Sequence, residues 1–231
     1  MHDIRCLQLR LNQYSFPYDM FRFRAAIIEK TRRQAPLFHN HNGDKNYVYR
    51  YPLIQYKVTY KKASIICLNE GVEEIHYLLQ QPDMQLRVGQ HINDYEIEEA
   101  QLYRFCVKIS QHPFHYSLLN WLALNQRHYR RFRELENDET AQINLLQSIL
   151  TGNILAFAKG VGWNVENRIH TQITEIKHLK TLPYKKQNVL AFTLNFQSNV
   201  SLPNFIGLGK GASTGFGIVK KIRTHANHSV N

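Results

Sequence analysis

The chain has 231 residues, and its 29 lysines and arginines against 18 acidic residues give a formal net charge of +11. A chain of this length can bury a hydrophobic core that is stable without a metal ion or a disulfide bond. The positive charge favours nucleic acid as a partner, with acidic membranes and acidic proteins as alternatives. The three cysteines are widely spaced, which excludes a disulfide framework and a CxxC site. No run of about 18 apolar residues is present, which excludes a membrane helix, so we expect a soluble protein of a reducing cytoplasm.

The first half of the chain alternates strand and helix patterns. Leucines alternate with polar residues over 7–11, which predicts a half-buried strand. Phe21, Ala25 and Ile28 then share one face of a predicted helix that ends before Pro36. Strand-forming sequence follows over 47–60 and 62–68, then a short helix over 71–81 and a strand over 84–89. The order β-α-β-β-α-β is that of a ferredoxin-like domain, which we place at residues 1–95.

The second half starts with a strand over 100–109 and continues with two helical patterns, over 115–135 and 140–161. Two strands, over 168–176 and 189–200, and a last one within 215–222 follow. We therefore expect a second ferredoxin-like domain at residues 96–224 and a flexible tail at 225–231. The predicted fold class is α+β, with two tandem domains that each carry an antiparallel sheet and helices on one face.

Five glycines lie within eleven residues near the C-terminal end, between Gly207 and Gly217. Glycine permits positive φ and lets backbone amides approach a phosphate closely, so the segment is a candidate RNA-binding loop. The spacing fits neither GxGxxG nor a Walker motif, and a glycine-rich hairpin that only permits tight packing is the structural alternative. The predicted RNA-binding residues are Gly207, Gly209, Lys210, Gly211, Ser213, Thr214, Gly215, Gly217, Lys220 and Lys221.

The glycine spacing, G-x-G, five residues and G-x-G, resembles the C-terminal loop of the RAMP superfamily of CRISPR proteins. Two ferredoxin-like halves with this loop late in the second are similar to the repeat-processing endoribonucleases of that superfamily. The FHNH sequence at 38–41, followed by the strand-forming 47–60, resembles the subgroup that serves type I-B systems. The resemblance implies that His39, His41, Lys30 and Tyr47 act in cleavage, that no metal or cofactor is needed, and that the cell is prokaryotic.

The chemistry of these residues agrees with that role. Metal-free RNA cleavage needs a base for the 2′-OH, an acid for the departing 5′-oxygen and a charge that stabilises the phosphorane. Histidine titrates near neutral pH and suits the first two tasks, so His39 or His41 is the predicted base and the other the helper. Lys30 would stabilise the developing charge. Tyr49 and Tyr51 share the strand face of Tyr47 and are alternatives to it.

Two further readings of the sequence bear on binding. Arginines with interleaved aromatic rings mark a second candidate RNA contact, at Arg127, Arg130, Arg131 and Arg133, for which a solvated helix face is an equal alternative. The His-x-His pair with Asp44 nearby could instead hold a metal ion, although we favour the metal-free reading.

The predicted function is a metal-independent endoribonuclease that binds CRISPR repeat RNA in the precursor transcript. It would cleave by 2′-OH attack to give a 2′,3′-cyclic phosphate and a 5′-hydroxyl. The alternatives are a non-catalytic RAMP subunit that binds guide RNA and a metal-dependent nuclease. The resemblance implies that other subunits of an interference complex are partners. We also consider a homodimer, and we expect no membrane partner.

Overall fold

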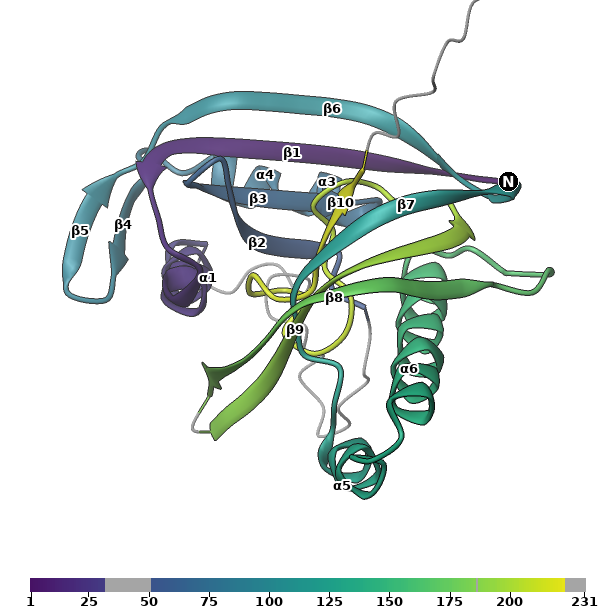
Figure 1. Ribbon diagram of the computed structural model, residues 1–231. Helices are drawn as coiled ribbons and strands as arrows, with labels where there is room; N and C mark the ends of the chain where they lie inside the picture. Colours follow the sequence, from purple (N-terminus) through teal and green to yellow (C-terminus); the bar gives the residue numbers. More distant parts are fainter. Residues whose placement is uncertain (32–50, 186, 223–231) are drawn as a thin grey trace, which may run out of the picture.

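The computed structural model describes residues 1–31, 51–185 and 187–222, and the described residues form two α+β domains (Figure 1). The first sheet has the order β2-β3-β1-β6, and the second has the order β10-β7-β9-β8. All neighbouring strands in both are antiparallel. Both orders match the ferredoxin-like sheet, so the predicted fold class is confirmed.

The first domain contains the strands β1 (His2–Tyr14), β2 (Ile54–Thr59), β3 (Lys62–Leu68) and β6 (Ile97–Val107). Its helices are η1 (Pro17–Asp19), α1 (Met20–Lys30), α3 (Glu70–Glu74) and α4 (His76–Leu79). A separate hairpin consists of β4 (Gln85–Val88) and β5 (His91–Asp94).

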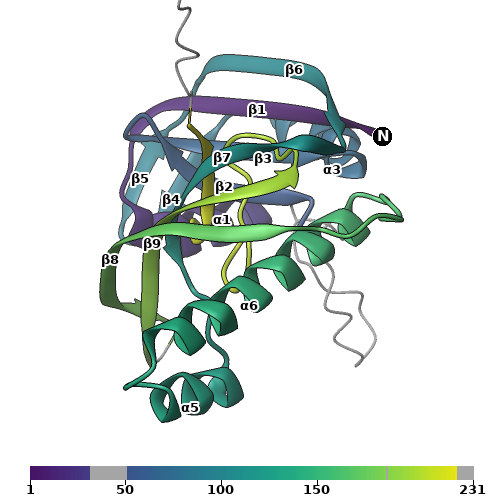
Figure 2. The same ribbon diagram turned by 45° about the vertical axis from the view of Figure 1, so that its right-hand side comes forward.

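The second domain contains the strands β7 (Ile109–Trp121), β8 (Thr171–Tyr184), β9 (Gln187–Val200) and β10 (Ile218–Lys221). Its helices are α5 (Gln126–Glu134) and α6 (Glu139–Gly160). Figure 2 shows α6 running along the second sheet. Within the described ranges, no helix is both long and apolar enough to span a membrane.

Both faces of β1 carry buried residues, because each face covers a different core. Leu7, Leu9 and Leu11 of β1 pack with the helices of the first domain. Ile4 and Cys6, on the opposite face of the same strand, belong to a cluster that continues into the second domain. The alternation predicted for residues 7–11 is thus correct. The second domain packs against the opposite face of β1, which would be exposed to solvent if the first domain stood alone.

Two predicted strands take different places from those expected. Residues 84–89 were expected to complete the first sheet, but they form β4, which pairs only with the adjacent β5. The strand expected to open the second domain is β6, and it pairs with β1 from His2↔Val107 to Leu11↔Ile97. The predicted division after residue 95 therefore falls just before a strand of the first sheet.

Two predictions about helices also need correction. Helix α1 exists, but its buried side chains are Met20, Phe23, Ala26 and Ile27. Of the predicted face, Ala25 is exposed, and Phe21 packs against Tyr184 and Phe216 of the second domain. The other correction concerns 115–135, where the first part is strand β7 and only α5 is helical. Helix α6 and strands β9 and β10 lie where the sequence predicted them, whereas β8 begins at Thr171 and extends beyond the predicted end at residue 176 to Tyr184.

Candidate functional site

Lys30, the lysine that the resemblance implicates in cleavage, is the last residue of α1. Its ammonium donates a hydrogen bond to the carboxylate of Asp83, ahead of β4, and one-fifth of the Lys30 side chain is exposed. Asp83 also accepts a hydrogen bond from the Gln85 backbone N–H at 2.8 Å. Both hydrogen bonds hold the pKa of Asp83 below its usual value, and the bond from Lys30 has the larger effect. The ion pair therefore orients the Lys30 ammonium.

Several predicted site residues lie outside the described residues, namely His39, His41 and Tyr47, with the alternative Tyr49. Tyr51, the other alternative to Tyr47, is among the described residues. Its hydroxyl donates to the carbonyl of Gly207 at 2.8 Å and accepts from Gln55 Nε2 at 2.9 Å. Its ring packs edge-on against Phe157 of α6, with 5.3 Å between centroids. Burial raises the pKa of the Tyr51 phenol, so this hydroxyl joins the two domains as a neutral donor.

The glycine-rich loop, residues 207–217, lies along β2, which is the edge strand of the first sheet. The Tyr56 N–H donates to the Ser213 carbonyl at 2.8 Å, and the Gly207 N–H donates to Gln55 Oε1 at 2.8 Å. An isolated parallel bridge also forms at Tyr56. A loop of the second domain thus covers the otherwise open edge of the first sheet.

The predicted RNA-binding residues of the loop differ in their access to solvent. The buried ones are Gly207, Thr214, Gly215 and Gly217. The half-buried ones are Gly209, Lys210, Gly211 and Ser213, and the exposed ones are Lys220 and Lys221. The close backbone approach expected of the glycines is used within the protein, since a β-carbon at position 207 would lie 2.5 Å from the carbonyl oxygen of Ala212. RNA contact stays a prediction, and the half-buried and exposed residues are those that can make it.

Lys57 on β2 is fully buried at this contact between the domains. Its ammonium donates a hydrogen bond to the carbonyl of Ala212 in the glycine-rich loop. Burial disfavours the charged form and lowers the pKa of Lys57 to about 7. A lysine in a strand ordinarily indicates an exposed position, so no local pattern predicts the burial of Lys57.

Lys57 is expected to make stability rise with pH. In the unfolded chain its pKa is about 10.4, so between about pH 7 and pH 10 the unfolded state binds one more proton than the folded state. The free energy of unfolding should then rise by up to about 1.4 kcal/mol per pH unit relative to a Lys57→Met variant. Urea denaturation of both proteins at several pH values measures this difference. Parallel profiles for the two proteins would show that the buried ammonium does not titrate in this window.

The predicted arginine cluster lies on α5, and all four of its arginines, Arg127, Arg130, Arg131 and Arg133, are exposed. Arg131 pairs with Glu134 at 3.0 Å, and Arg133 pairs with Glu136 at 3.2 Å. Figures 1 and 2 place α5 at the end of the second domain far from β1 and β6. The cluster therefore lies away from the first sheet, and its contact with RNA stays a prediction.

The sequence did not single out a set of exposed aromatic residues on the first domain. The tyrosines of 47–60 were considered together as core or stacking residues, yet Tyr56 is fully buried and Tyr60 is 71% exposed. Tyr60 and Lys61 include none of the usual turn residues such as Gly, Asn or Asp, so no local signal separates Tyr60 from the strand.

The two tandem ferredoxin-like domains, with the glycine-rich loop between the last two strands of the second, agree with the predicted resemblance to the repeat-processing endoribonucleases. A model of the Cas6b N-terminal domain matches residues 2–105, and a model of the Cas6b C-terminal domain matches residues 108–222. The chain therefore belongs to the Cas6b family.

Solved structures support this assignment over nearly the whole chain. A crystal structure of Cas6b aligns with a TM-score of 0.84 and 25% identity, over 96% of this chain and 100% of that one. A second, described as the CRISPR RNA processing endoribonuclease Cas6b, aligns with a TM-score of 0.72 and 21% identity over the same shares. A protein of Methanocaldococcus jannaschii, named as uncharacterized, is 34% identical over 102 residues, which is 44% of this chain and 67% of that protein.

Proposed function

We propose that this chain is a metal-independent endoribonuclease that cuts CRISPR precursor RNA within its repeats to release guide RNAs. Membership of the Cas6b family is the observation that carries the proposal. RNA processing is named for one of the similar Cas6b structures. The net charge of +11 and the histidine pair supply the matching electrostatics and chemistry.

The proposed reaction needs no group from outside the chain and the RNA. His39 or His41 takes the proton of the 2′-OH as the 2′-oxygen bonds to phosphorus. The bond from phosphorus to the 5′-oxygen breaks, and the other histidine protonates that oxygen. The products are a 2′,3′-cyclic phosphate and a 5′-hydroxyl. Tyr47 would hydrogen-bond the ribose or orient a histidine.

Lys30 would stabilise the extra negative charge of the phosphorane. Its ion pair with Asp83 fits this role in one respect, because an oriented ammonium loses less conformational freedom when the transition state forms. The same carboxylate offsets part of the positive charge, so Lys30 would contribute less than an unpaired lysine.

The RNA backbone would meet the half-buried part of the glycine-rich loop, the lysines of β10 and, at a distance, the arginines of α5. These contacts would position the RNA rather than read its bases. The product RNA would then be retained or passed to other CRISPR-associated subunits in a prokaryotic cytoplasm.

Incubation of labelled repeat RNA with the protein in EDTA tests the proposal. We expect one cut per repeat at an unchanged rate, because the chemistry requires no divalent cation. Cleavage that disappears in EDTA and returns with Mg²⁺ or Mn²⁺ would select the metal-dependent nuclease instead. Tight binding of the repeat without any cleavage would select the guide-binding subunit.

A further inference from the structure

Exposed aromatic side chains gather where β1 ends and β2 turns into β3. Each exposes between 58% and 75% of its surface, and they are Tyr14, Phe16, Tyr18 and Tyr60. Tyr14 is the cross-strand partner of Lys62, and the Ser15 N–H donates to the Lys61 carbonyl at 3.0 Å. These contacts place the β1 end directly beside the β2–β3 turn. We call these four residues, together with Phe205 of the second domain, the aromatic stripe.

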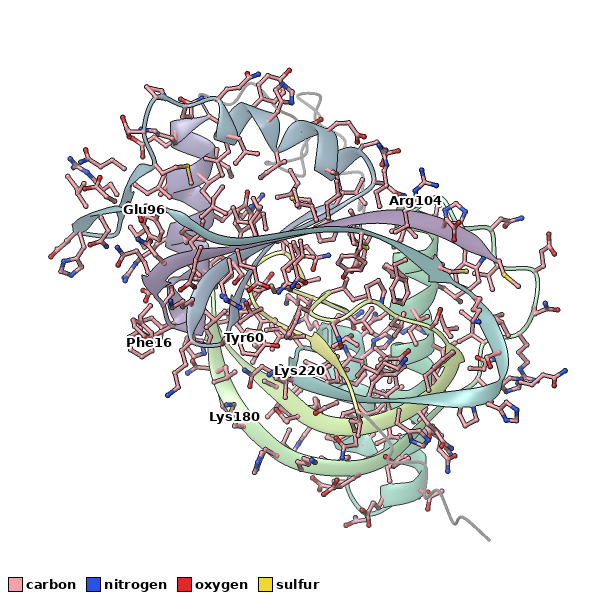
Figure 3. The ribbon with its side chains drawn as sticks, turned by 90° about the horizontal axis from the view of Figure 1, so that it is seen from above. Phe16, Tyr60, Glu96, Arg104, Lys180 and Lys220 are labelled. Atoms are coloured by element: carbon pink, nitrogen blue, oxygen red, sulfur yellow. The ribbon has the colours of Figure 1, made fainter. Side chains whose placement is uncertain are left out.

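The stripe crosses from the first domain to the second. The rings of Tyr60 and Phe205 meet at 68° with 6.0 Å between centroids. Arg10 lies 5.5 Å from the Tyr60 ring centre, and the Lys220 ammonium lies 6.0 Å from that of Phe205. Figure 3 shows the labelled Phe16, Tyr60 and Lys220 following one another from the start of the η1 and α1 segment toward β10. Cations and rings therefore alternate along one surface that both domains build.

Two residues of the stripe, Tyr60 and Phe205, have backbone conformations that cost free energy. Tyr60 and Lys61 form a two-residue turn with φ of 51° and 66°, and Phe205 has φ of 67°. Asn-Gly is the favoured sequence for such a turn, and bulky residues are disfavoured there. Strained residues of this kind cluster at functional sites. A solvent-exposed tyrosine at this turn adds little to the stability of the core. The presence of the Tyr60 ring there therefore indicates that it binds a ligand.

The charges beside the stripe favour a polyanion. Arg10 and Lys62 share Glu98, at 3.2 and 2.6 Å, and these contacts lower the pKa of that carboxyl. Lys61 and Lys220 have no ion pair with any carboxylate of the described residues. Lysines can meet phosphates while bases stack on the rings, and every base offers a face for stacking. A double helix hides those faces, so the surface fits unpaired nucleotides.

We propose that the aromatic stripe binds single-stranded RNA by stacking unpaired bases on Phe16, Tyr60 and their neighbours. The proposal relies on the proposed function only for RNA as the polyanion. It assigns the stripe to the unpaired part of the transcript, separately from the histidines that cut.

The test uses the full chain in EDTA and a labelled single-stranded RNA of about ten nucleotides without repeat sequence. Fluorescence anisotropy measures its affinity for the wild type, for Phe16→Ala and for the double variant Tyr60→Asn with Lys61→Gly. We expect Phe16→Ala to weaken binding about 5- to 100-fold, which is the loss of one stacked base, and the double variant to weaken it at least as much, because it also removes the Lys61 ammonium. The double variant should also raise the thermal midpoint of unfolding, because Asn-Gly relieves the turn. Lower affinity in a more stable protein cannot come from misfolding.

Leu102→Ala is the matched control. Leu102 is 67% exposed on β6 and pairs with Leu7, so it lies on the helix-bearing face of the first sheet. We expect wild-type affinity for this variant. Wild-type affinity in both stripe variants, or an equal loss in the control, would overturn the proposal. If the stripe variants lose affinity but the protein never cuts repeat RNA, the proposed function is wrong and the stripe proposal stands. If the protein cuts repeat RNA but the stripe variants bind single-stranded RNA normally, the stripe proposal is wrong and the proposed function stands.

Discussion

Alanine in place of His39 or of His41 is expected to slow cleavage of repeat RNA by about 10²–10⁴-fold, which is the usual contribution of a general acid or base. The larger loss identifies the base that takes the 2′-OH proton. RNA affinity should stay at the wild-type value, because neither imidazole is proposed to hold the RNA backbone. Single-turnover cleavage and filter binding on the same preparations measure the two quantities.

His112→Ala is the control for this pair, since His112 is an exposed histidine on β7 outside the proposed site. It should cleave at the wild-type rate. Unchanged rates in both the His39 and His41 variants would contradict the catalytic assignment, whatever the family.

Gly217→Ala is expected to destabilise the protein by about 2–5 kcal/mol, a large part of the stability of an ordinary domain. Gly217 has φ of 60°, and a β-carbon there would lie 1.9 Å from the carbonyl oxygen of Leu208. That oxygen belongs to the loop backbone, so relief requires the loop to move away from its present contacts. Urea denaturation gives the change in the free energy of unfolding.

Gly152→Ala provides the opposite expectation from the same chemical change. Gly152 is an exposed helical residue of α6, and a β-carbon there meets nothing within 4 Å. Alanine should stabilise it by up to about 1 kcal/mol. If Gly217→Ala were equally harmless and only weakened RNA binding, the loop would be a ligand loop and not part of the packing between the domains.

The fold could be predicted where the pattern that forms an element lies within that element. Helix α6 and strand β9 show strong periodicity and lie as expected. Strand β7 was partly mistaken for helix because its alternation is short. Tyr116 and Leu118 alternate as buried residues, but Asn120 at φ of 49° breaks the register and buries Trp121 as well. The partner of β6 is β1, more than 80 residues away in the sequence, and no local pattern specifies that pairing.

For the candidate site, too, the features that local sequence predicts differ from those that depend on contacts between distant residues. The glycine spacing and the His-x-His pair are local motifs, and they were sufficient to indicate the family that the domain matches confirm. The burial of Lys57 and the hydrogen bond from Tyr51 to Gly207 depend on a loop about 150 residues further along. The aromatic stripe likewise joins Tyr60 to Phe205. Such contacts arise only when the two domains pack together.

The loop has a more specific role than its composition suggested. Its glycines let the second domain reach an edge strand of the first, and its less buried residues are the ones proposed to contact RNA. Packing of the domains and presentation of the RNA backbone would therefore depend on the same eleven residues.

A single 2′-deoxy substitution at the cut site of the repeat RNA tests the central claim most directly. The 2′-oxygen is the proposed nucleophile, so the substituted RNA should bind normally and remain uncut in EDTA while the all-ribose RNA is cleaved to a 2′,3′-cyclic phosphate. Cleavage of the deoxy-substituted RNA at the same bond would contradict the mechanism.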